Sequence, residues 1–221
     1  MTVHFLAPEN KDEWNPIWKK CFDTWISKNS NSINTDNSIS IWTDEGIDKL
    51  LQEDDEEFYN EYLNKCPNIY KWDYVRYIIL ERYGGMYVDM DVELIDNSFI
   101  NKLHPRKIYL MEGTGGTYVE NSIMISPLNP ANKQIWNRVK VFAKNKIIGR
   151  SREYANDWEG AVWVVGAQLI SEFFIKHLPY NSQNHREHYD ILAWEHFGNK
   201  NGTLNYTKHY QTSTNVIQTT S

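Results

Sequence analysis

Two aspartates separated by one residue, Asp89 and Asp91, form the residue pair in the sequence with the clearest potential to bind a metal ion. They close an apolar segment, Met86 to Val92, whose alternating pattern predicts a strand. Side chains two apart in an extended chain point to the same face, so we expect the two carboxylates to lie side by side. Two such oxygen donors suit Mg²⁺ or Mn²⁺, and a cation would relieve their mutual repulsion. An isolated Asp-x-Asp triplet is weak support, because two exposed acids at a strand end have the same spacing.

A second charged pair, Asp73 and Arg76, precedes the aspartates on a strongly helical segment, Tyr70 to Tyr83. Residues three apart lie on one face of a helix. A surface ion pair has this spacing too, and it would contribute little to stability. Gly84-Gly85 ends the helix and leads into the strand. Because ligands of open α/β sheets bind at the carboxyl ends of strands, we expect Asp73 and Arg76 to face that edge and to hydrogen-bond a ligand there.

The metal hypothesis predicts a definite chemistry. A divalent ion held by Asp89 and Asp91 with open coordination positions would bind a diphosphate. The same ion would stabilise the negative charge that develops on a phosphate leaving group. The sequence therefore predicts a metal-dependent group transfer.

The segment from Lys71 to Asp96, KWDYVRYIILERYGGMYVDMDVELID, joins these features in one helix-Gly-Gly-strand-acid pattern. It closely resembles the Asp-x-Asp sugar-binding region of glycosyltransferase family 32, which includes capsular-polysaccharide and yeast mannosyl transferases and is related to the clostridial glucosylating toxins. Asn121 to Ser126 is similar to a later strand of the family, and Val165-Gly166-Ala167 occupies the place of its Gly-Pro turn. The family's N-terminal Ile-Pro-Lys-x-Ile-His start is absent, so no nucleobase pocket is identified.

The resemblance implies a GT-A fold: one Rossmann-like α/β domain over residues 1–221, with a mostly parallel central sheet flanked by helices. It implies a nucleoside diphosphate sugar as donor, with UDP as the expected nucleotide and GDP as the alternative, and Mn²⁺ (or Mg²⁺) as cofactor. The acceptor would be a hydroxyl of a glycan or glycoprotein, with retention of the anomeric configuration. On the matching positions, Asp73 and Arg76 contact the donor sugar, Asp89 contacts ribose, sugar and metal, and Asp91 binds the metal.

GT-A enzymes often supply a further metal or phosphate ligand from near the C-terminus. The resemblance therefore implies His209 as a metal ligand, because imidazole suits Mn²⁺, with His196 as the competing ligand. A surface histidine is the equally weighted alternative for His209. Lys208 and Ser213 are the candidates for contact with the diphosphate.

The acceptor side is less defined by the sequence. Asp157, Trp158 and Glu159 lie in a polar segment before a predicted helix, and Glu112 follows a predicted strand. A helix cap at Asp157 and a surface acid at Glu159 are the competing interpretations. No general base is assigned, because the departing phosphate can take the acceptor proton.

Strands and helices alternate along the chain, which predicts an α/β fold with a largely parallel sheet. The predicted strands are Val3 to Ala7, 40–43, 86–92, 108–111 and 122–126. One predicted helix begins near Pro16, a second follows an N-cap at Asp44, and three more span 70–83, 130–142 and 161–177. The acidic run Glu53 to Glu57 is expected to be a solvated face.

Composition limits the function classes. The 221 residues suffice for one domain, and the net charge of −6 without a basic stripe argues against nucleic acid as a partner. No segment approaches the roughly 18 apolar residues of a membrane span, and no signal peptide is recognised. Two cysteines fit a reducing setting, so we expect a soluble, cytoplasmic protein.

Two other functions remain open from the sequence. Apolar-Asp-x-Asp also resembles the nucleophile motif of haloacid-dehalogenase phosphatases, although their later paired-acid motif is not found. A non-catalytic carbohydrate-binding module is favoured only by the aromatic content of 14%. Most of these aromatic residues are expected to fill the core.

Overall fold

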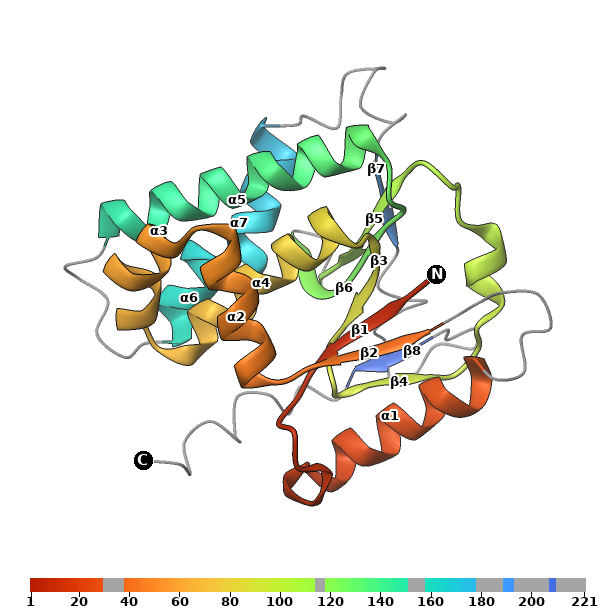
Figure 1. Ribbon diagram of the computed structural model, residues 1–221. Coiled ribbons are helices and arrows are strands. Elements are labelled where there is room, and N and C mark those ends of the chain that lie inside the picture. Colours follow the sequence, from red (N-terminus) through yellow and green to blue (C-terminus); the bar gives the residue numbers. More distant parts are fainter. Residues whose placement is uncertain (30–37, 114–117, 151–157, 178–188, 193–206, 210–221) are drawn as a thin grey trace.

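The computed structural model describes residues 1–29, 38–113, 118–150, 158–177, 189–192 and 207–209. A six-stranded sheet runs through its centre in the order β2-β1-β3-β6-β5-β7 (Figure 1). The strands are β1 (Val3–Leu6), β2 (Ile39–Trp42), β3 (Gly85–Val88), β5 (Ile108–Glu112), β6 (Val119–Ser126) and β7 (Tyr189–Leu192). A second sheet pairs β4 (Val92–Leu94) with β8 (Thr207–His209) in antiparallel fashion.

Three of the five strand pairings in the main sheet are parallel, so the predicted mostly parallel sheet is confirmed. The exception is β6, which runs antiparallel to both β3 and β5. Its first residues therefore lie at the same edge of the sheet as the last residues of β3 and β5. This edge carries the acidic pair.

Helices cover both faces of the sheet (Figure 1). The helical elements are η1 (Lys11–Glu13), α1 (Pro16–Asn29), α2 (Asp44–Asp54), α3 (Glu56–Glu61), η2 (Leu63–Lys65), α4 (Asn68–Arg82), η3 (Ser98–Lys102), α5 (Pro130–Arg150), α6 (Trp158–Val164), α7 (Ala167–Glu172) and η4 (Phe173–His177). One hydrophobic core joins the sheet to α2 through α7, and the other joins it to α1, β4 and η3. None of the helices in the described part of the chain is long and apolar enough to cross a bilayer.

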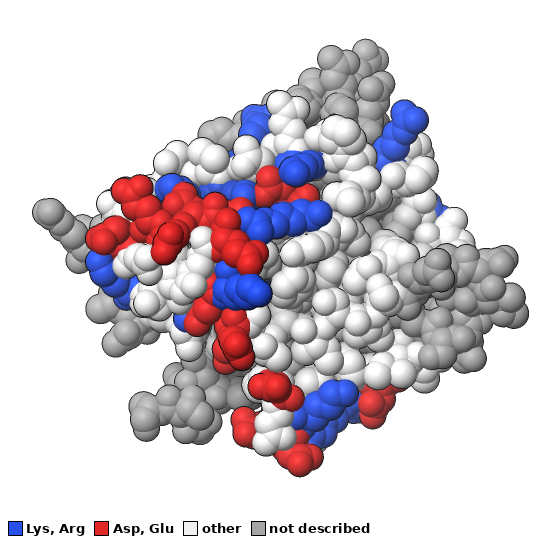
Figure 2. Space-filling model, viewed as in Figure 1, with Lys and Arg blue, Asp and Glu red and all other residues white. Residues whose placement is uncertain are grey.

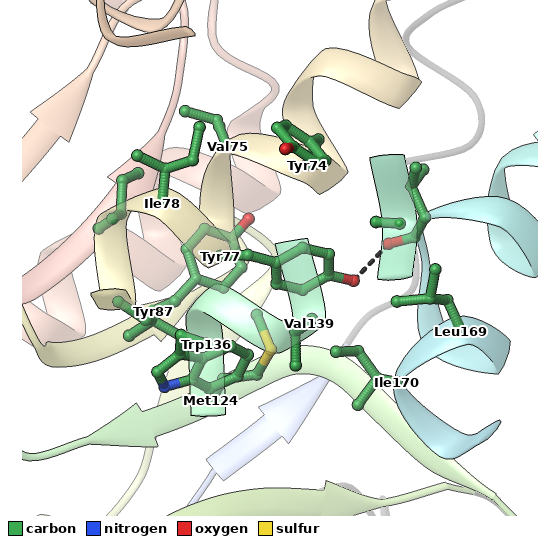
Figure 3. Close-up of a cluster of buried hydrophobic side chains, with 14 of the residues drawn as sticks. Tyr74, Val75, Tyr77, Ile78, Tyr87, Met124, Trp136, Val139, Leu169 and Ile170 are labelled. Carbon is green, nitrogen blue, oxygen red and sulfur yellow. Dashed lines mark hydrogen bonds between the residues drawn. The ribbon is translucent and has the colours of Figure 1, made fainter. Parts of the chain in front are cut away.

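Helix α4 lies at the centre of the first core, which explains why its own sequence carries buried residues on nearly every side. Its Tyr77 ring stacks on Trp136 of α5 with centroids 5.9 Å apart, and its hydroxyl donates to the Val165 carbonyl (Figure 3). The Trp136 indole N–H in turn donates to Ser126 Oγ at 2.8 Å. These contacts fix the axial position and rotation of the helix that carries Asp73 and Arg76.

The turn from α4 into β3 depends on two glycines. Gly84 and Gly85 have φ values of 62° and 90°, which side chains rarely tolerate. A Cβ on Gly85 would lie 2.4 Å from the Thr2 carbonyl oxygen. His4 of β1 completes the turn, because its Nε2 contacts the Gly84 carbonyl oxygen at 3.0 Å.

The chain after β3 differs from the predicted continuous strand. β3 ends at Val88, and the Val92 N–H donates to the Asp89 carbonyl at 3.1 Å, closing a turn before β4 begins. The expectation that Asp89 and Asp91 share one face of an extended strand is therefore wrong. A turn allows the chain to leave the main sheet and enter the small one at the position of the acids.

Two further element boundaries differ from those predicted from the sequence. The predicted helix over 161–177 is interrupted at Gly166, where the N–H groups of both Val165 and Gly166 donate to the Ala161 carbonyl. The N-cap of α2 is Thr43 rather than Asp44, because the Thr43 side chain accepts from the Gly46 N–H.

The acidic run before α3 is only partly solvated. Figure 2 shows acidic side chains gathered over the α2–α3 region with basic side chains between them. Asp54 pairs with the buried Lys140 of α5 at 2.8 Å, and Asp55 pairs with Lys144 at 2.5 Å. The expectation of a wholly solvated face is corrected for these two aspartates, because α5 supplies lysines that the local sequence cannot reveal.

Candidate functional site

Asp89 is held at the carboxyl end of β3 by three contacts. Its N–H donates to the Ser122 carbonyl of β6 at 2.9 Å, which continues the β3–β6 pairing by one residue. Its Oδ1 accepts a hydrogen bond from the Tyr87 hydroxyl at 2.6 Å and lies 3.3 Å from Arg76 Nη2. The first acid of the pair therefore has a fixed orientation, with 15% of its side chain exposed.

Arg76 is the central cation of the site. Its Nη2 lies 3.0 Å from Asp73 Oδ1, its Nη1 donates to the Asn121 carbonyl at 3.2 Å, and its guanidinium lies 4.6 Å from the centroid of the Tyr87 ring. Burial alone would lower the pKa of Arg76, but the carboxylates of Asp73 and Asp89 outweigh burial and raise it. Arg76 therefore remains charged and links the two acids.

Asp73 lies against three separate segments of the chain. Asn121 of β6 donates from Nδ2 to Asp73 Oδ1 at 3.1 Å, and Arg76 pairs with the same oxygen. The interruption between α6 and α7 lies close to Asp73 Oδ2, since a Cβ built on Gly166 would be 3.0 Å from it. Burial raises the pKa of Asp73, and Arg76 and Asn121 oppose that rise. The interpretation of Asp73 and Arg76 as a surface ion pair is therefore wrong, because both are buried.

Asp91 is fully buried beside the start of β4, with 0% of its surface exposed. The antiparallel register places the backbone of His209 opposite Val92, the residue after Asp91, and Lys208 opposite Glu93. The C-terminal segment thus reaches the strand that follows the acid pair. The side chains of Lys208 and His209 lie outside what the structure describes.

The other sequence-derived candidates are placed only in part. Ser213, His196 and Asp157 lie outside the described residues. Trp158 and Glu159 begin α6. Glu112 is half-buried at the end of β5, at the same edge of the sheet as Asp89.

The donor set of this site fits a hard divalent cation. Asp89 and Asp91 supply carboxylate oxygens, the ligands preferred by Mg²⁺ and Mn²⁺. Three carboxylates (Asp73, Asp89 and Asp91) and one guanidinium (Arg76) leave a formal charge of −2. Within the described residues no group of three or more His, Cys, Asp or Glu could hold a metal, so an ion held by Asp89 and Asp91 would need further ligands from elsewhere.

Sequence reasoning missed several residues of this site. Tyr87 is two residues before Asp89 on a strand, so the period-2 rule could have placed it beside that carboxylate. Asn121 was recognised only as part of a strand. Glu120 is a buried carboxylate on β6 that contacts the Tyr118 hydroxyl at 3.2 Å and Ser122 Oγ at 3.3 Å. No local pattern marks Asn121, because its partners Asp73 and Arg76 come from α4.

Comparison with known proteins agrees with this geometry. Residues 16–119 match the family model described as a glycosyltransferase sugar-binding region containing the DXD motif. The chain is 33% identical over 84 residues to inositol phosphoceramide mannosyltransferase 3 of Schizosaccharomyces pombe, covering 38% of this chain and 21% of that protein. It is 26% identical over 137 residues to mannosyl phosphorylinositol ceramide synthase CSH1 of Saccharomyces cerevisiae, covering 61% of this chain and 33% of the relative.

These matches span a third or less of each relative's length. Among solved structures, the PaToxG glycosyltransferase superposes with a TM-score of 0.52 at 17% identity, covering 84% of this chain and 72% of that one. At that identity the likeness concerns the fold alone. The family model ends at Val119, two residues before Asn121, so it includes Asp73, Arg76, Asp89 and Asp91.

Proposed function

We propose that this chain, a family 32-like glycosyltransferase with a GT-A fold, transfers a sugar from a nucleoside diphosphate sugar to a hydroxyl of a glycan or glycoprotein. One observation carries the proposal. Asp73, Arg76 and Asp89 form a single buried network at the edge of the sheet where the Asp89–Asp91 turn begins. Ligands of open α/β sheets bind at this edge.

The donor is proposed to be a UDP-sugar, with a GDP-sugar as the alternative, and the cofactor Mn²⁺ or Mg²⁺. When bound, the ion would compensate the diphosphate charge and stabilise the leaving group. Asp91 and Asp89 are its proposed ligands, with His209 as a third. Lys208 and Ser213 are proposed to contact the diphosphate.

Arg76 and Asp73 are proposed to hold the donor sugar. Arg76 fixes the orientation of the Asp73 and Asp89 carboxylates, because it pairs with both. A carboxylate held in this way accepts hydrogen bonds from sugar hydroxyls without having to reorganise first. It can therefore orient the bound sugar for reaction. Transfer is proposed to retain the anomeric configuration, and no side chain is assigned as general base.

The two other functions considered from the sequence have less support. Neither the family model nor the yeast relatives belong to phosphatases or to non-catalytic carbohydrate-binding modules. The acid pair also follows the third strand of the chain, whereas the phosphatase nucleophile usually follows the first. The single domain over residues 1–221 and the cytoplasmic location expected from the sequence stay predictions.

The proposal is tested with a panel of UDP- and GDP-sugars in the presence of Mn²⁺, measuring release of nucleoside diphosphate. We expect one donor to be turned over, and we expect chelation of the metal to abolish turnover. Asp91→Asn should reduce the rate by at least about 100-fold, because it removes one charge from the metal ligands. Asp23→Asn, at an exposed position on α1, is the matched control. Full activity of Asp91→Asn would contradict the metal assignment.

A further inference from the structure

Helix α1 holds the strand that directly follows the acid pair. The Val92 carbonyl, one residue after Asp91, accepts a hydrogen bond from the indole N–H of Trp25 at 2.8 Å. The Leu94 N–H donates to Thr24 Oγ1 at 2.9 Å. The donor Trp25 and the acceptor Thr24 are thus neighbours in the sequence of α1, and both bind the backbone of β4. Figure 1 shows α1 lying alongside β4.

Further polar contacts extend this attachment along β4 and the residues after it. Lys20 pairs with Glu93 at 3.2 Å, and Lys28 Nζ donates to the Ile95 carbonyl. The Asn97 amide donates back to the Lys28 carbonyl at 3.0 Å. Lys20, Thr24 and Lys28 are four residues apart, so they lie on one face of α1. That face follows β4 residue by residue.

The side chains of α1 take the place of a neighbouring strand. Backbone groups of alternate residues in a strand point to the same edge, so those of Val92 and Leu94 face α1 and those of Glu93 are left for β8. In the part of the chain that the structure describes, β8 is the strand paired with β4. Buried backbone groups that lose their partners are costly, so β4 depends on α1 for its position.

Trp25 is the most deeply buried of these α1 residues. Its side chain is fully buried and packs edge-on against Phe5 of β1, with ring centroids 6.0 Å apart. Its N–H is therefore fixed by the core and donates to the carbonyl of Val92, the residue after Asp91. Val92 thus binds Trp25 through its carbonyl and closes the turn through its N–H, which donates to the Asp89 carbonyl.

We propose that Trp25 and Thr24 are positioning residues for the acid pair: α1 anchors β4 and thereby sets the place of Asp91 at the donor site. The role in donor binding rests on the proposed function. Trp25 acts more strongly than Thr24, because its partner is one residue from Asp91 and that of Thr24 is three residues from it.

The anchoring is tested by amide hydrogen exchange, which requires no ligand. Trp25→Phe retains most of the packing and removes the N–H, and we expect the Val92 amide to exchange at least about tenfold faster. Thr24→Val removes the acceptor of the Leu94 N–H and should speed exchange at Leu94. Trp14→Phe is the matched control, because Trp14 is also buried and donates its indole N–H elsewhere, to the Pro8 carbonyl. Equal Val92 exchange in Trp25→Phe and Trp14→Phe would overturn the anchoring.

The effect on the donor site is tested by electron paramagnetic resonance titration of Mn²⁺ with UDP or GDP. We expect Trp25→Phe to weaken Mn²⁺ binding in the presence of the nucleotide about tenfold, Thr24→Val less, and Trp14→Phe not at all. Faster exchange with unchanged Mn²⁺ affinity would overturn the positioning role. If the unmutated protein binds no Mn²⁺ with either nucleotide, the proposed function fails, and the positioning role at the donor site fails with it. Amide hydrogen exchange then still decides whether α1 anchors β4. If Trp25→Phe does not fold, Thr24→Val carries both measurements.

Discussion

At the residue scale, the site depends on close contacts that leave little room for change. Asp73 contacts Arg76 and Asn121, and Gly166 leaves no room for a Cβ beside its carboxylate. Its partners come from α4, β6 and the α6–α7 interruption, so a shift in any of these segments would move the carboxylate.

Gly166→Ala should reduce activity by displacing Asp73. The added Cβ would lie 2.9 Å from the Val162 Cα and 3.0 Å from Asp73 Oδ2. Since displacement of about 1 Å at an oriented site can cost on the order of 100-fold in rate, we expect donor turnover to fall about 10- to 100-fold. Gly149→Ala on α5, where nothing lies within 4 Å, is the control and should stabilise the protein by up to about 1 kcal/mol. Equal donor turnover by the two variants would contradict the prediction.

His4 should make stability fall in mild acid. Burial lowers the pKa of His4 from 6.5 to about 4, although the hydrogen bond to Gly84 opposes the shift. The unfolded chain then binds more protons between these pH values, so the stability contribution is complete above pH 6.5 and is lost as the pH falls toward about 4. The loss is on the order of 3 kcal/mol.

Urea denaturation at several pH values checks this dependence on His4. His4→Asn should remove most of the slope between about pH 6.5 and 4, because the titrating ring is gone. His104→Asn, at an exposed position, should keep the slope of the unmutated protein. A slope that survives in His4→Asn would assign the acid sensitivity to other groups.

At the element scale, three helices are joined by a buried ionic network. Lys140 of α5 lies 2.8 Å from Asp54 of α2 and 2.5 Å from Glu81 of α4, and Arg82 of α4 also pairs with Asp54 at 3.1 Å. The network lies near the C-terminal end of α4, about one and a half helical turns beyond Arg76. It therefore fixes the end of α4 that precedes the Gly84-Gly85 turn.

Lys140→Met should destabilise the fold by roughly 3 kcal/mol, because it leaves Glu81 as a buried carboxylate without its cation. Replacing both partners, as Lys140→Met with Glu81→Met, should recover much of the loss, since apolar residues often replace a buried pair at little cost. Thermal and urea denaturation measure both effects. Lys133→Met, on an exposed position of the same helix, is the control. Similar losses for Lys140→Met and Lys133→Met would show that the network contributes little.

At the scale of the whole molecule, the acid pair joins two sheets. β3 belongs to the six-stranded sheet and β4 to the two-stranded one, and Asp89 to Asp91 form the connection. Helix α1 and β8 hold β4, whereas α4 and β6 hold Asp89. A ligand bound between these parts should therefore stabilise the entire fold.

Mn²⁺ together with the preferred nucleotide diphosphate should raise the Tm. At about 100 times the Kd, binding to the folded state contributes about 2.7 kcal/mol. For a chain of this length that corresponds to roughly 5–10 °C. Mn²⁺ alone or nucleotide alone should shift the Tm less, because each lacks the partner that completes the coordination. A differential scanning measurement in which the mixture gives no more than the separate components would contradict joint binding.

The sequence by itself determined the α/β class, the helix that carries Asp73 and Arg76, and the order of the acid pair after Gly84-Gly85. These features follow from local periodicity and from the backbone freedom of glycine, both of which act over a few residues. Only the tertiary structure decided that Asp73 and Arg76 are buried, that the acids occupy a turn, and that Asn121, Gly166 and Trp25 support them. The hydrogen bonds of Asn121 to Arg76 and of Trp25 to Val92 join residues 45 and 67 positions apart. Contacts at such separations depend on how helices and strands pack, and the local pattern of the chain does not specify which partners meet.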